Sequence, residues 1–502
     1  MEQSGTRPVI AIVGAGIAGL AAAFFLRDEP AHVIVLDGAP RPGGKLAVAE
    51  VAGCRVDVGA EALLTRRPEG TSLIEAAGLG GDLVPAGTTA ARIWSRGAMR
   101  PLPARQFMGV PADAAGLAQT GLLSAAGLAR ARQEPDLPGT GRDGDVPVAS
   151  YVAARFGQEV VDRLVDPLLG GVYAGRSDEL SFEATLPALA EASRRHGTLT
   201  AAAATLLPPA GNGAEAGAPR PPVFSSLAGG LGTLPPALAA ASGAELRTGA
   251  IVRELVPVQP RRGATVGGVL GGRPPRASTA GGWRLTIGSA HAPQWLDADA
   301  VILALPARPA SRLLAGVPGA AAAAAALGEI SYASMAIVTL AYPRAAFPQL
   351  PDTSGYLVPA VDGHPVKAVT FSSVKWPQLQ RRAADLIFVR CSVGRIGEEQ
   401  VLQRDDADLA ALAAADLAAA TGVRGAPAAS LVTRWGGALP QYTVGHLDRV
   451  ARVQASLATQ PGLAACGAAF AGVGIPACIG TARGAVDQVL AELQKDGSHV
   501  SN

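Results

Sequence analysis

The feature that most constrains the fold is an apolar run followed by a glycine-rich turn near the amino end. Residues 9–13 (VIAIV) form a continuous apolar stretch, which is typical of a parallel strand buried on both faces. The turn 14–19 (GAGIAG) follows, and the apolar stretch 20–26 predicts a helix. A second apolar run, 32–36, ends at Asp37. This order predicts a strand–helix–strand unit of an α/β protein.

The turn has the spacing GxGxxG, in which each glycine has a separate task. The first permits the tight turn, the second lets the main chain approach a diphosphate, and the third lets the helix pack closely on the strand. The helix start offers unpaired N–H groups and a partial positive charge to phosphates. Asp37 is placed to accept hydrogen bonds from an adenosine ribose. We therefore expect a dinucleotide to contact Gly14, Ala15, Gly16, Ile17, Ala18, Gly19, Asp37 and Gly38.

Two further segments favour a flavin over a nicotinamide dinucleotide. The segment 41–46 (RPGGKL) resembles the second phosphate-contacting motif of the glutathione-reductase-like flavoproteins, in particular the amine-oxidase superfamily. The segment 467–475, before a predicted helix over 474–493, resembles their closing motif, whose helix start points at the flavin ring and stabilises negative charge there. The resemblance implies FAD as cofactor. It adds expected contacts at Gly43, Gly44, Lys45, Gly59, Ala60, Glu61, Ala62, Val252, Val473, Gly474 and Ile475.

The composition excludes several classes of protein. The 502 residues carry a net charge of +2, whereas a dedicated nucleic-acid binder shows a strong basic excess. No stretch of about 20 strongly apolar residues occurs, so we expect no integral membrane segment. The amino end lacks the apolar core of a signal peptide, and the four cysteines form no CxxC pair. We expect a cytoplasmic protein with no metal site and no nucleic-acid partner.

The order of predicted elements indicates a split nucleotide-binding domain with other domains inserted. Apolar runs at 300–305 and 462–466 predict further strands of the first sheet. The expected fold is α/β, a glutathione-reductase-like FAD-binding Rossmann fold of the amine-oxidase superfamily, with an interleaved antiparallel-sheet substrate domain and a helical domain. The expected domain boundaries are 1–90, 223–310 and 441–502 for the FAD-binding domain, 91–205 for the helical domain with adjoining strands, and 311–440 for the substrate domain.

Three segments rich in Gly, Pro, Ala or Arg interrupt this pattern: 133–147, 208–222 and 258–282. The last two are long for a compact domain. We expect all three to be surface loops with no part in the chemistry.

Further motifs are specific to one family. They are 171–175 (GVYAG), 225–232 (SSLAGGLG), 439–446 (LPQYTVGH) and 472–479 (GVGIPACI). With them the chain resembles, over essentially its whole length, the oxygen-dependent protoporphyrinogen/coproporphyrinogen III oxidases of haem synthesis. The resemblance implies that FAD accepts hydride from a porphyrinogen and that molecular oxygen reoxidises the flavin, releasing hydrogen peroxide. It implies no catalytic side chain and no metal, because the flavin does the hydride chemistry.

The resemblance places a few side chains against the substrate, an apolar macrocycle with a fringe of carboxylates. Arg92 falls where the family has an arginine for a propionate, and a solvated surface arginine is the alternative. Leu357 falls at an aliphatic position against the macrocycle, and an ordinary core leucine is an equal alternative. Tyr356, Tyr332 and Met335 are weaker candidates for the same pocket.

Two other positions bear on the family pattern. The family usually has glutamate where this chain has Asp37, a shorter carboxylate with the same hydrogen-bonding task. His446 is the one histidine on a family motif, and we expect it to be a structural hydrogen-bonding residue rather than a base.

The carboxylate count separates the two substrates of the family. Coproporphyrinogen III carries more propionates and is water-soluble, whereas protoporphyrinogen IX favours membranes. A chain with no membrane-anchoring segment and with arginines at 92–105 favours coproporphyrinogen III, with protoporphyrinogen IX as the alternative. Pathway logic alone suggests a coproporphyrin ferrochelatase as partner.

Two rival functions use the same fold. A flavin amine oxidase typically needs an aromatic cage, whereas only 4% of this chain is aromatic; a carotenoid-type desaturase needs a lipid tunnel, which sequence cannot exclude. A non-catalytic binding protein is the rival from another class, since a fold does not prove a function. The intact second and third flavin motifs argue against it.

Overall fold

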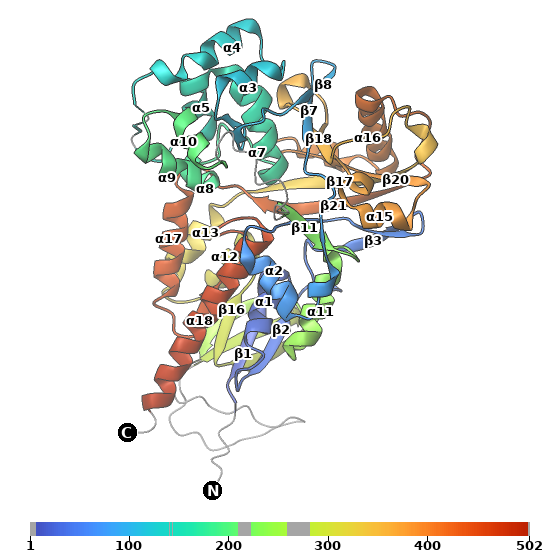
Figure 1. The fold of residues 1–502 in the computed structure, drawn as a ribbon. Coiled ribbons are helices and arrows are strands. Elements are labelled where there is room, and N and C mark those ends of the chain that lie inside the picture. Colours follow the sequence, from blue (N-terminus) through green and yellow to red (C-terminus); the bar gives the residue numbers. More distant parts are fainter. Residues whose placement is uncertain (1–6, 140, 143, 209–221, 259–281, 500–502) are drawn as a thin grey trace.

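The computed structural model describes residues 7–139, 141–142, 144–208, 222–258 and 282–499. The predicted loops 208–222 and 258–282 therefore lie, except for their end residues, outside the described residues. Figure 1 shows three parts: a nucleotide region at the bottom, a mixed sheet across the middle, and a helical region at the upper left.

The nucleotide region is built on a five-stranded parallel sheet. Its strands are short apolar runs that are almost completely buried, as expected for a parallel sheet covered on both faces. The first strand pairs with the second and with a strand almost three hundred residues later, so distant parts of the chain meet in one sheet. The strand order is β12 (Glu245–Arg247), β2 (His32–Leu36), β1 (Val9–Val13), β16 (Ala300–Leu303) and β22 (Leu463–Ala465).

Different elements cover the two faces of this sheet. Apolar side chains of three helices pack on one face, and a three-stranded antiparallel sheet with three more helices packs on the other. The first cover consists of α1 (Ile17–Phe25), α11 (Leu234–Ser242) and α18 (Ile475–His499). The second consists of β13 (Val252–Val258), β14 (Gly282–Ser289), β15 (Ala292–Ala298), α12 (Ala307–Leu314), α13 (Ala321–Gly328) and α17 (His446–Leu457).

The mixed sheet has seven strands and joins the other two parts. All of its strand pairs are antiparallel except the parallel pair of β18 and β7. Helix α16 (Asp406–Thr421) packs on one face, and the hairpin β3 (Val48–Val51) and β4 (Cys54–Asp57) packs on the other. The strand order is β21 (Ala429–Pro440), β17 (Tyr332–Pro343), β20 (Leu386–Val393), β19 (Val366–Phe371), β18 (Gly355–Leu357), β7 (Ala91–Ser95) and β8 (Ala98–Pro101).

The helical region surrounds a separate apolar core. Side chains of Asp113, Ser124, Ser181 and Thr198 accept hydrogen bonds from N–H groups three residues further on, so they cap four of its helices. The helices are α3 (Ala114–Gln119), α4 (Ala125–Arg132), α5 (Val148–Phe156), α6 (Gln158–Val160), a π-helical turn (Val161–Val165), α7 (Asp166–Tyr173), α8 (Phe182–Thr185), α9 (Pro187–Arg195) and α10 (Leu199–Thr205).

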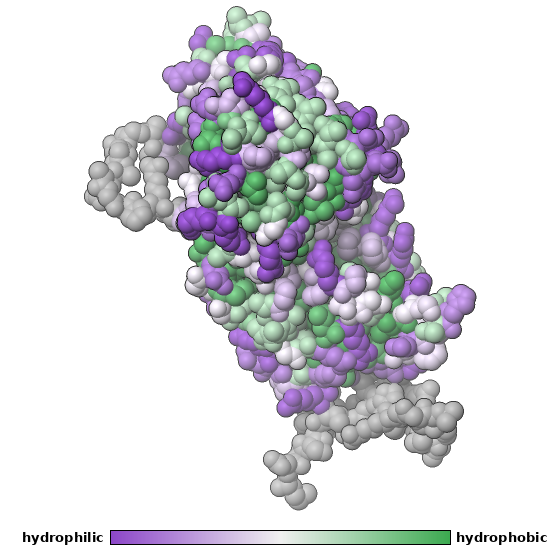
Figure 2. Space-filling view, turned by 90° about the vertical axis from the view of Figure 1, so that its right-hand side faces the viewer, coloured by the Kyte–Doolittle hydropathy of each residue, from purple (hydrophilic) through white to green (hydrophobic). Residues whose placement is uncertain are grey.

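Smaller elements complete the chain. They are β5 (Leu63–Leu64), α2 (Pro68–Ala76), β6 (Leu83–Pro85), β9 (Gln106–Phe107), β10 (Val110–Pro111), β11 (Phe224–Leu227), α14 (Ser372–Lys375) and α15 (Pro377–Arg382). Within the described residues, no helix has both the length and the apolar character needed to cross a membrane. On the side shown in Figure 2, apolar residues lie in patches between polar ones.

One residue of the predicted loop 133–147 is anchored in the core. Glu134 is fully buried, and its Oε1 accepts a hydrogen bond of 2.7 Å from the buried guanidinium of Arg155. The same oxygen accepts one of 2.7 Å from the N–H of Leu199 at the start of α10. The described residues among 137–146 have no helix or strand and are exposed or half-buried, as predicted, while Glu134 ties two helices together.

Candidate functional site

The turn after β1 has the geometry that its glycines predict. Gly14 has a φ of +109°, and a Cβ atom there would lie 2.4 Å from the carbonyl oxygen of Ala304 at the end of β16. A Cβ atom on Gly19 would lie 1.8 Å from the carbonyl oxygen of Gly14. Both positions accept only glycine, because main chain packs directly on main chain.

Gly16 differs from the other two glycines of the motif. It precedes α1 with extended backbone, and a Cβ atom there would meet nothing within 4 Å. No side chain caps the first turn of α1, and the first bond in the helix runs from the Leu20 N–H to the Gly16 carbonyl. The space over this helix start is open, and the N–H groups and the helix dipole favour an anion there.

The segment 41–46 lies directly against this turn. The N–H of Gly43 donates to the carbonyl of Ala15 at 2.7 Å, and Gly43 forms a β-bridge with Gly16. A Cβ atom on Gly44 would lie 3.4 Å from the Gly16 Cα. The structure thus brings together two motifs that the sequence predicted to contact phosphates.

The end of β2 lies beside the same turn. Asp37 accepts hydrogen bonds from the Ala15 N–H at 2.6 Å and the Ala39 N–H at 2.7 Å. Each carboxylate oxygen has two acceptor positions, so capacity for a further donor remains. A Cβ atom on Gly38 would lie 3.0 Å from the side chain of Ile251, the neighbour of Val252. Asp37, Gly38 and Val252 therefore lie together.

The segment 58–62 crosses the segment that follows Gly44. The N–H of Ala60 donates to the Lys45 carbonyl at 2.9 Å, and a Cβ atom on Gly59 would lie 1.9 Å from the same oxygen. Burial lowers the pKa of the Lys45 ammonium, which lies close enough to Cys478 in α18 to interact with it electrostatically. Ala62 packs against the hairpin that covers the mixed sheet.

Glu61, predicted as a cofactor contact, points its side chain into a buried ion cluster. Its carboxylate pairs with the Lys375 ammonium at 2.8 Å and with the Arg390 guanidinium. Burial alone would raise the pKa of Glu61, but the two cations outweigh burial and hold it well below its usual range. Arg390 also donates to the Gly59 carbonyl, so the cluster fastens the segment 59–61 to the mixed sheet. No local sequence pattern connects Lys375 with this segment.

The closing motif lies over the start of α1 from the opposite side. A Cβ atom on Gly467 would lie 3.9 Å from the Ala18 side chain. The N–H of Cys478 donates to the Gly474 carbonyl at 3.0 Å, which begins the helical turn of α18. Ile475 is buried in the core of the nucleotide region, and Val473 packs against the core of the helical region. These residues therefore lie where the two regions meet.

Two of the specific motifs, GVYAG and LPQYTVGH, pack directly on each other. Ala174 ends α7 in the left-handed conformation, with a φ of +48°. A Cβ atom on Gly175 would lie 2.2 Å from the side-chain oxygen of Gln441. The amide nitrogen of Gln441 donates to the Tyr173 carbonyl at 2.8 Å. This contact holds the helical region against the end of β21.

A groove of about 590 Å³ opens beside the segment 58–62. The indole N–H of Trp435 donates to the Val58 carbonyl at 2.9 Å, and its ring lies 3.1 Å from the position of a Cβ atom on Gly59. Sequence reasoning singled out Met335 and missed Leu402 and Trp435. The lining residues are Ser334, Met335, Glu399, Leu402, Gln403, Arg404, Asp405, Asp406, Arg434, Trp435 and Gly436.

The predicted substrate residues do not share one surface. Leu357 is half-buried, and its Cδ2 lies 3.1 Å from the position of a Cβ atom on Gly171 in α7, so it faces the helical region. Tyr356, its neighbour, is 3% exposed and lies in an aromatic cluster with Trp94 and Phe371. The prediction of Tyr356 as a pocket residue is corrected here, because alternate strand residues leave opposite faces.

Arg92 lies on β7 directly beside Tyr356, while Ile93 lies beside Leu357. Ile93 belongs to the core of the helical region, so Arg92 and Leu357 point to opposite faces of the sheet. The Arg92 side chain is 39% exposed and forms an ion pair of 2.9 Å with Asp352. Both readings of Arg92, as a surface residue and as a ligand for a carboxylate, are compatible with this position.

Comparison with known proteins identifies the family. The family described as flavin containing amine oxidoreductase matches residues 17–490. The chain belongs to this family. The coproporphyrinogen III oxidase of Mycobacterium tuberculosis (strain ATCC 25618 / H37Rv) is 38% identical over 487 residues, which cover 96% of this chain and 97% of the relative. The coproporphyrinogen III oxidase of Bacillus subtilis (strain 168) is 30% identical, covering 96% and 98%.

Solved structures agree with the flavin amine oxidoreductase fold. A protein of Exiguobacterium sp. 255-15, provisionally named a protoporphyrinogen oxidase, is 28% identical with a TM-score of 0.80, covering 98% of this chain and 99% of its own. Cyclohexylamine oxidase of Brevibacterium oxydans IH-35A is 16% identical with a TM-score of 0.67, covering 97% and 100%, and supports the fold alone. The predicted α/β fold and the FAD cofactor are confirmed.

The residues around the turn after β1 fit the family's flavin. The open space over Gly16 suits a diphosphate, since the uncapped start of α1 lies below it. Asp37 bonds to this turn from the end of β2, and the segment 58–62 bonds to Lys45, which follows the glycines 43–44. An elongated dinucleotide with a ribose at one end and a ring at the other matches this order.

Proposed function

We propose that this chain is an FAD-dependent oxidase that converts coproporphyrinogen III to coproporphyrin III, with molecular oxygen as acceptor and hydrogen peroxide as product. The observation that carries the proposal is near-full-length similarity to coproporphyrinogen III oxidases of several bacteria, at 27–38% identity with 96% of this chain covered each time. Since a fold supports many activities, the site must supply the remaining argument.

The cofactor end of the site acts through main chain. When bound, FAD accepts hydride from a reduced substrate and passes electrons to oxygen. The start of α1 and the glycines at 43–44 hold the diphosphate, and Asp37 holds the ribose. The start of α18 lies at the other end, where its N–H groups favour negative charge on the ring. Lys45, whose charged form burial disfavours, lies near this helix start.

The substrate end acts through apolar surface. Leu357 against Gly171, and Met335, Leu402 and Trp435 along the groove, offer apolar side chains to a macrocycle. They orient the macrocycle and keep water from its reacting carbon. The groove is also lined by acidic side chains beside Arg404 and Arg434, so it presents both negative and positive charges to a ligand.

Carboxylates of the substrate need cations. Arg92, the cation that the family pattern offers, points to the opposite face of the mixed sheet from Leu357, so it would bind a propionate apart from the Leu357 surface. Arg92 is accessible, and its present partner, Asp352, is 67% exposed. Because an exposed ion pair contributes little, a propionate can replace Asp352 at small cost. We therefore keep Arg92 as the proposed propionate ligand.

No side chain is assigned as a base. His446 is fully buried, and burial lowers its pKa to about 4, so its ring is uncharged at neutral pH. Its Nε2 faces the Phe470 carbonyl at 3.4 Å, which leaves it a structural role.

An anaerobic mixing experiment tests the proposal. The FAD-loaded enzyme is mixed with coproporphyrinogen III, protoporphyrinogen IX or cyclohexylamine, and bleaching of the flavin absorbance is followed. Coproporphyrinogen III should bleach it fastest, and admission of air should restore the colour with release of hydrogen peroxide. Faster bleaching by the amine, or no bleaching by either porphyrinogen, would overturn the proposal.

Protoporphyrinogen IX as main substrate is the second candidate. The observation that favours it is the 28% identity to the protoporphyrinogen oxidase of Bos taurus over 96% of this chain. Identity to the mycobacterial coproporphyrinogen III oxidases is higher, at 37–38%. The relative rates in the mixing experiment decide between the two.

Two proposals concern the cellular setting. We propose a cytoplasmic location, which cell fractionation followed by immunoblotting tests. We also propose a coproporphyrin ferrochelatase as partner, because coproporphyrin must next accept a metal in a pathway to haem. Retention of this chain on an immobilised ferrochelatase, compared with an immobilised unrelated protein, tests the contact.

A further inference from the structure

The loop before α18, residues 468–472, is held from one side by two aromatic side chains of the segment 442–446. The hydroxyl of Tyr442 donates to the Ala468 carbonyl at 2.6 Å and accepts from the Gly472 N–H at 2.9 Å. These two bonds join both ends of the loop through one oxygen atom. The loop leads directly into Val473, Gly474 and α18.

The imidazole of His446 holds the middle of the same loop. Its Nε2 faces the Phe470 carbonyl at 3.4 Å, and a carbonyl can only accept, so Nε2 carries the proton. The ring stacks on Tyr442, with centroids 3.8 Å apart and planes 15° apart. Both side chains are almost completely buried, at 0% and 1% exposure. Two stacked rings thus satisfy three main-chain groups of the loop.

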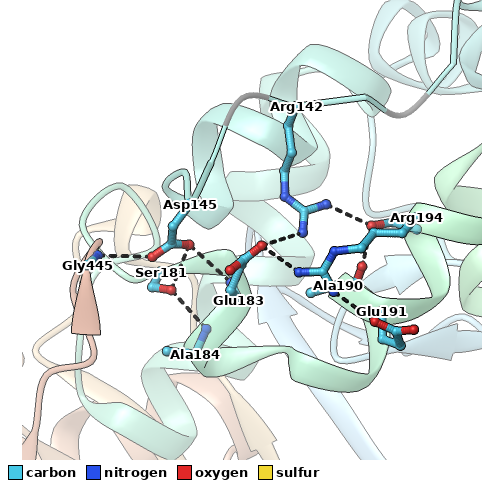
Figure 3. Close-up of polar contacts among 10 residues, drawn as sticks. Arg142, Asp145, Ser181, Glu183, Ala184, Ala190, Glu191, Arg194 and Gly445 are labelled. Carbon is cyan, nitrogen blue, oxygen red and sulfur yellow. Dashed lines mark hydrogen bonds and ion pairs between the residues drawn. The ribbon is translucent and has the colours of Figure 1, made fainter. Parts of the chain in front are cut away.

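The segment that carries these rings is itself fastened to the helical region. Figure 3 shows Asp145 between Ser181 and Gly445. Its carboxylate accepts from the Ser181 hydroxyl at 2.8 Å and from the Gly445 N–H at 3.0 Å. The Ser181 N–H donates to the Tyr442 carbonyl at 2.7 Å. Asp145 therefore fixes the position of the segment relative to α8.

We propose that Tyr442 and His446 are positioning residues that hold the loop 468–472 and, through it, the start of α18 against the FAD ring, and that Asp145 sets their position. This inference rests on the family's flavin and not on the identity of the porphyrinogen. Neither ring is required to touch the substrate. Their effect reaches FAD through the main chain of the loop, which has glycines with positive φ at Gly467 and Gly472 and so lacks stiffness of its own.

The test compares two buried tyrosines. Tyr442→Phe removes the hydroxyl and keeps the stacked ring. Tyr342→Phe is the matched control, because Tyr342 is fully buried in the mixed sheet and its hydroxyl has no partner within the described residues. The dissociation constant of FAD is measured by quenching of flavin fluorescence in apoenzyme, and the melting temperature of the apoenzyme is measured alongside.

Tyr442→Phe should weaken FAD binding about tenfold, the range expected for loss of one or two neutral hydrogen bonds. The apoenzyme of Tyr442→Phe should also melt at a lower temperature than that of Tyr342→Phe, because two main-chain groups of the loop lose their partner. Tyr342→Phe should bind FAD as the wild type does. An unchanged dissociation constant for Tyr442→Phe would overturn the proposal. So would a fall in melting temperature with no loss of affinity beyond the control, since this result would mean a purely structural role.

Asp145→Asn gives an independent test if Tyr442→Phe yields no folded protein. It keeps the shape of the side chain and removes one acceptor for the Ser181 hydroxyl or the Gly445 N–H. A two- to threefold weaker affinity for FAD, about the effect of one weakened hydrogen bond, is expected. Wild-type affinity in this variant would contradict the role of Asp145. Neither measurement uses a porphyrinogen. A negative result for these variants therefore does not bear on the proposed oxidase reaction, which the anaerobic mixing experiment tests separately.

Discussion

The nucleotide region and the mixed sheet hold their functional segments in different ways. In the nucleotide region main chain packs on main chain, so that a Cβ atom on Gly19 would lie 1.8 Å from the Gly14 carbonyl oxygen. At the mixed sheet, the buried charged side chains of Arg390 and Lys375 bind the segment 59–61. Both pair with the Glu61 carboxylate, and Arg390 also donates to the Gly59 carbonyl. The comparison teaches that the first region tolerates almost no added atom, whereas the second depends on charge balance. Each prediction below tests one side of this contrast.

The largest effect is expected at the glycine turn. Gly19→Ala should leave no bound FAD and lower the free energy of unfolding by about 3 kcal/mol or more, because the added carbon overlaps main chain. Flavin content and chemical denaturation measure this. Gly16→Ala is the matched control, since its Cβ meets nothing within 4 Å.

The control separates folding from binding at the same turn. Gly16→Ala should keep the stability of the apoenzyme, but its methyl group enters the proposed diphosphate space, so the dissociation constant of FAD should rise about 100-fold. Normal FAD affinity in Gly16→Ala would mean that the diphosphate does not lie over the start of α1.

The buried ion cluster should show the next largest effect. Arg390→Leu leaves the Glu61 carboxylate buried with one cation instead of two, and loss of a partner from a buried pair lowers the free energy of unfolding by about 3–5 kcal/mol. Urea denaturation measures it. The exposed pair Arg67–Glu69 is the control, and Arg67→Ala should change stability by about 0–1 kcal/mol. Equal losses in the free energy of unfolding of Arg390→Leu and Arg67→Ala would contradict the dependence of the mixed sheet on its buried charges.

The same cluster has a pH signature. Because the cations hold the pKa of Glu61 below its ordinary value, its contribution to stability is present above about pH 4.3, the usual pKa of glutamate, and is lost as the pH falls further. Glu61→Gln should lack this acid-dependent component.

A buried lysine of the mixed sheet should also make stability rise with pH, but in the alkaline range instead of the acid range. Lys367 is 3% exposed and donates to the Gly394 carbonyl, and burial lowers its pKa to about 7. Between about pH 7 and pH 10 the unfolded chain binds one more proton at this site, so stability should rise with pH by up to about 1.4 kcal/mol per unit. Lys367→Met should flatten this slope in denaturation measured at several pH values. An unchanged slope would show that Lys367 keeps an ordinary pKa.

The smallest effect on stability is expected at Arg92. Arg92→Ala removes an exposed ion pair with Asp352, so the free energy of unfolding should change by less than about 1 kcal/mol. The KM for coproporphyrinogen III should rise about fivefold or more while kcat changes little, since a charge-assisted contact to a propionate is lost. Asp352→Asn is the matched control, because it frees Arg92 and should leave KM unchanged or lower it. A wild-type KM in Arg92→Ala would remove the propionate assignment.

The nucleotide region could be predicted from the sequence because its signals are local. Residues 9–13, 32–36 and 300–305 are short apolar runs beside glycines or an acidic residue, and they form β1, β2 and β16 with shifts of at most two residues. The close approaches at Gly14 and Gly19 follow from the GxGxxG spacing itself. Local chemistry decides the fold there.

The groove could not be predicted in the same way, because its lining residues meet through strand pairing. Met335 pairs with Trp435 across β17 and β21, which are far apart in the chain, and the register shifts between Ala333 and Met335. Strand β21 was not expected at all, since Gly436 and Gly437 interrupt its apolar pattern. Nothing local indicates that Trp435 reaches the Val58 carbonyl.

Tyr356 and Glu61 show a second limit. A three-residue strand such as β18 gives too short an alternation to tell which of Tyr356 and Leu357 faces the helical region. At Glu61 the family resemblance predicts a cofactor contact, while no local pattern shows that its side chain pairs with Lys375 in α14 and Arg390 in β20, far along the chain. In both cases distant packing decides the direction of the side chain.

The five-stranded sheet places β22, near the carboxyl end of the described chain, beside β16 and in one sheet with β1. A ribosome must therefore release nearly all of this chain before the sheet is complete and α18 can reach the start of α1. Cofactor capture is then a late event of biogenesis. A truncated chain that lacks α18 should therefore hold no FAD and be sensitive to proteases, which flavin absorbance and limited proteolysis would show.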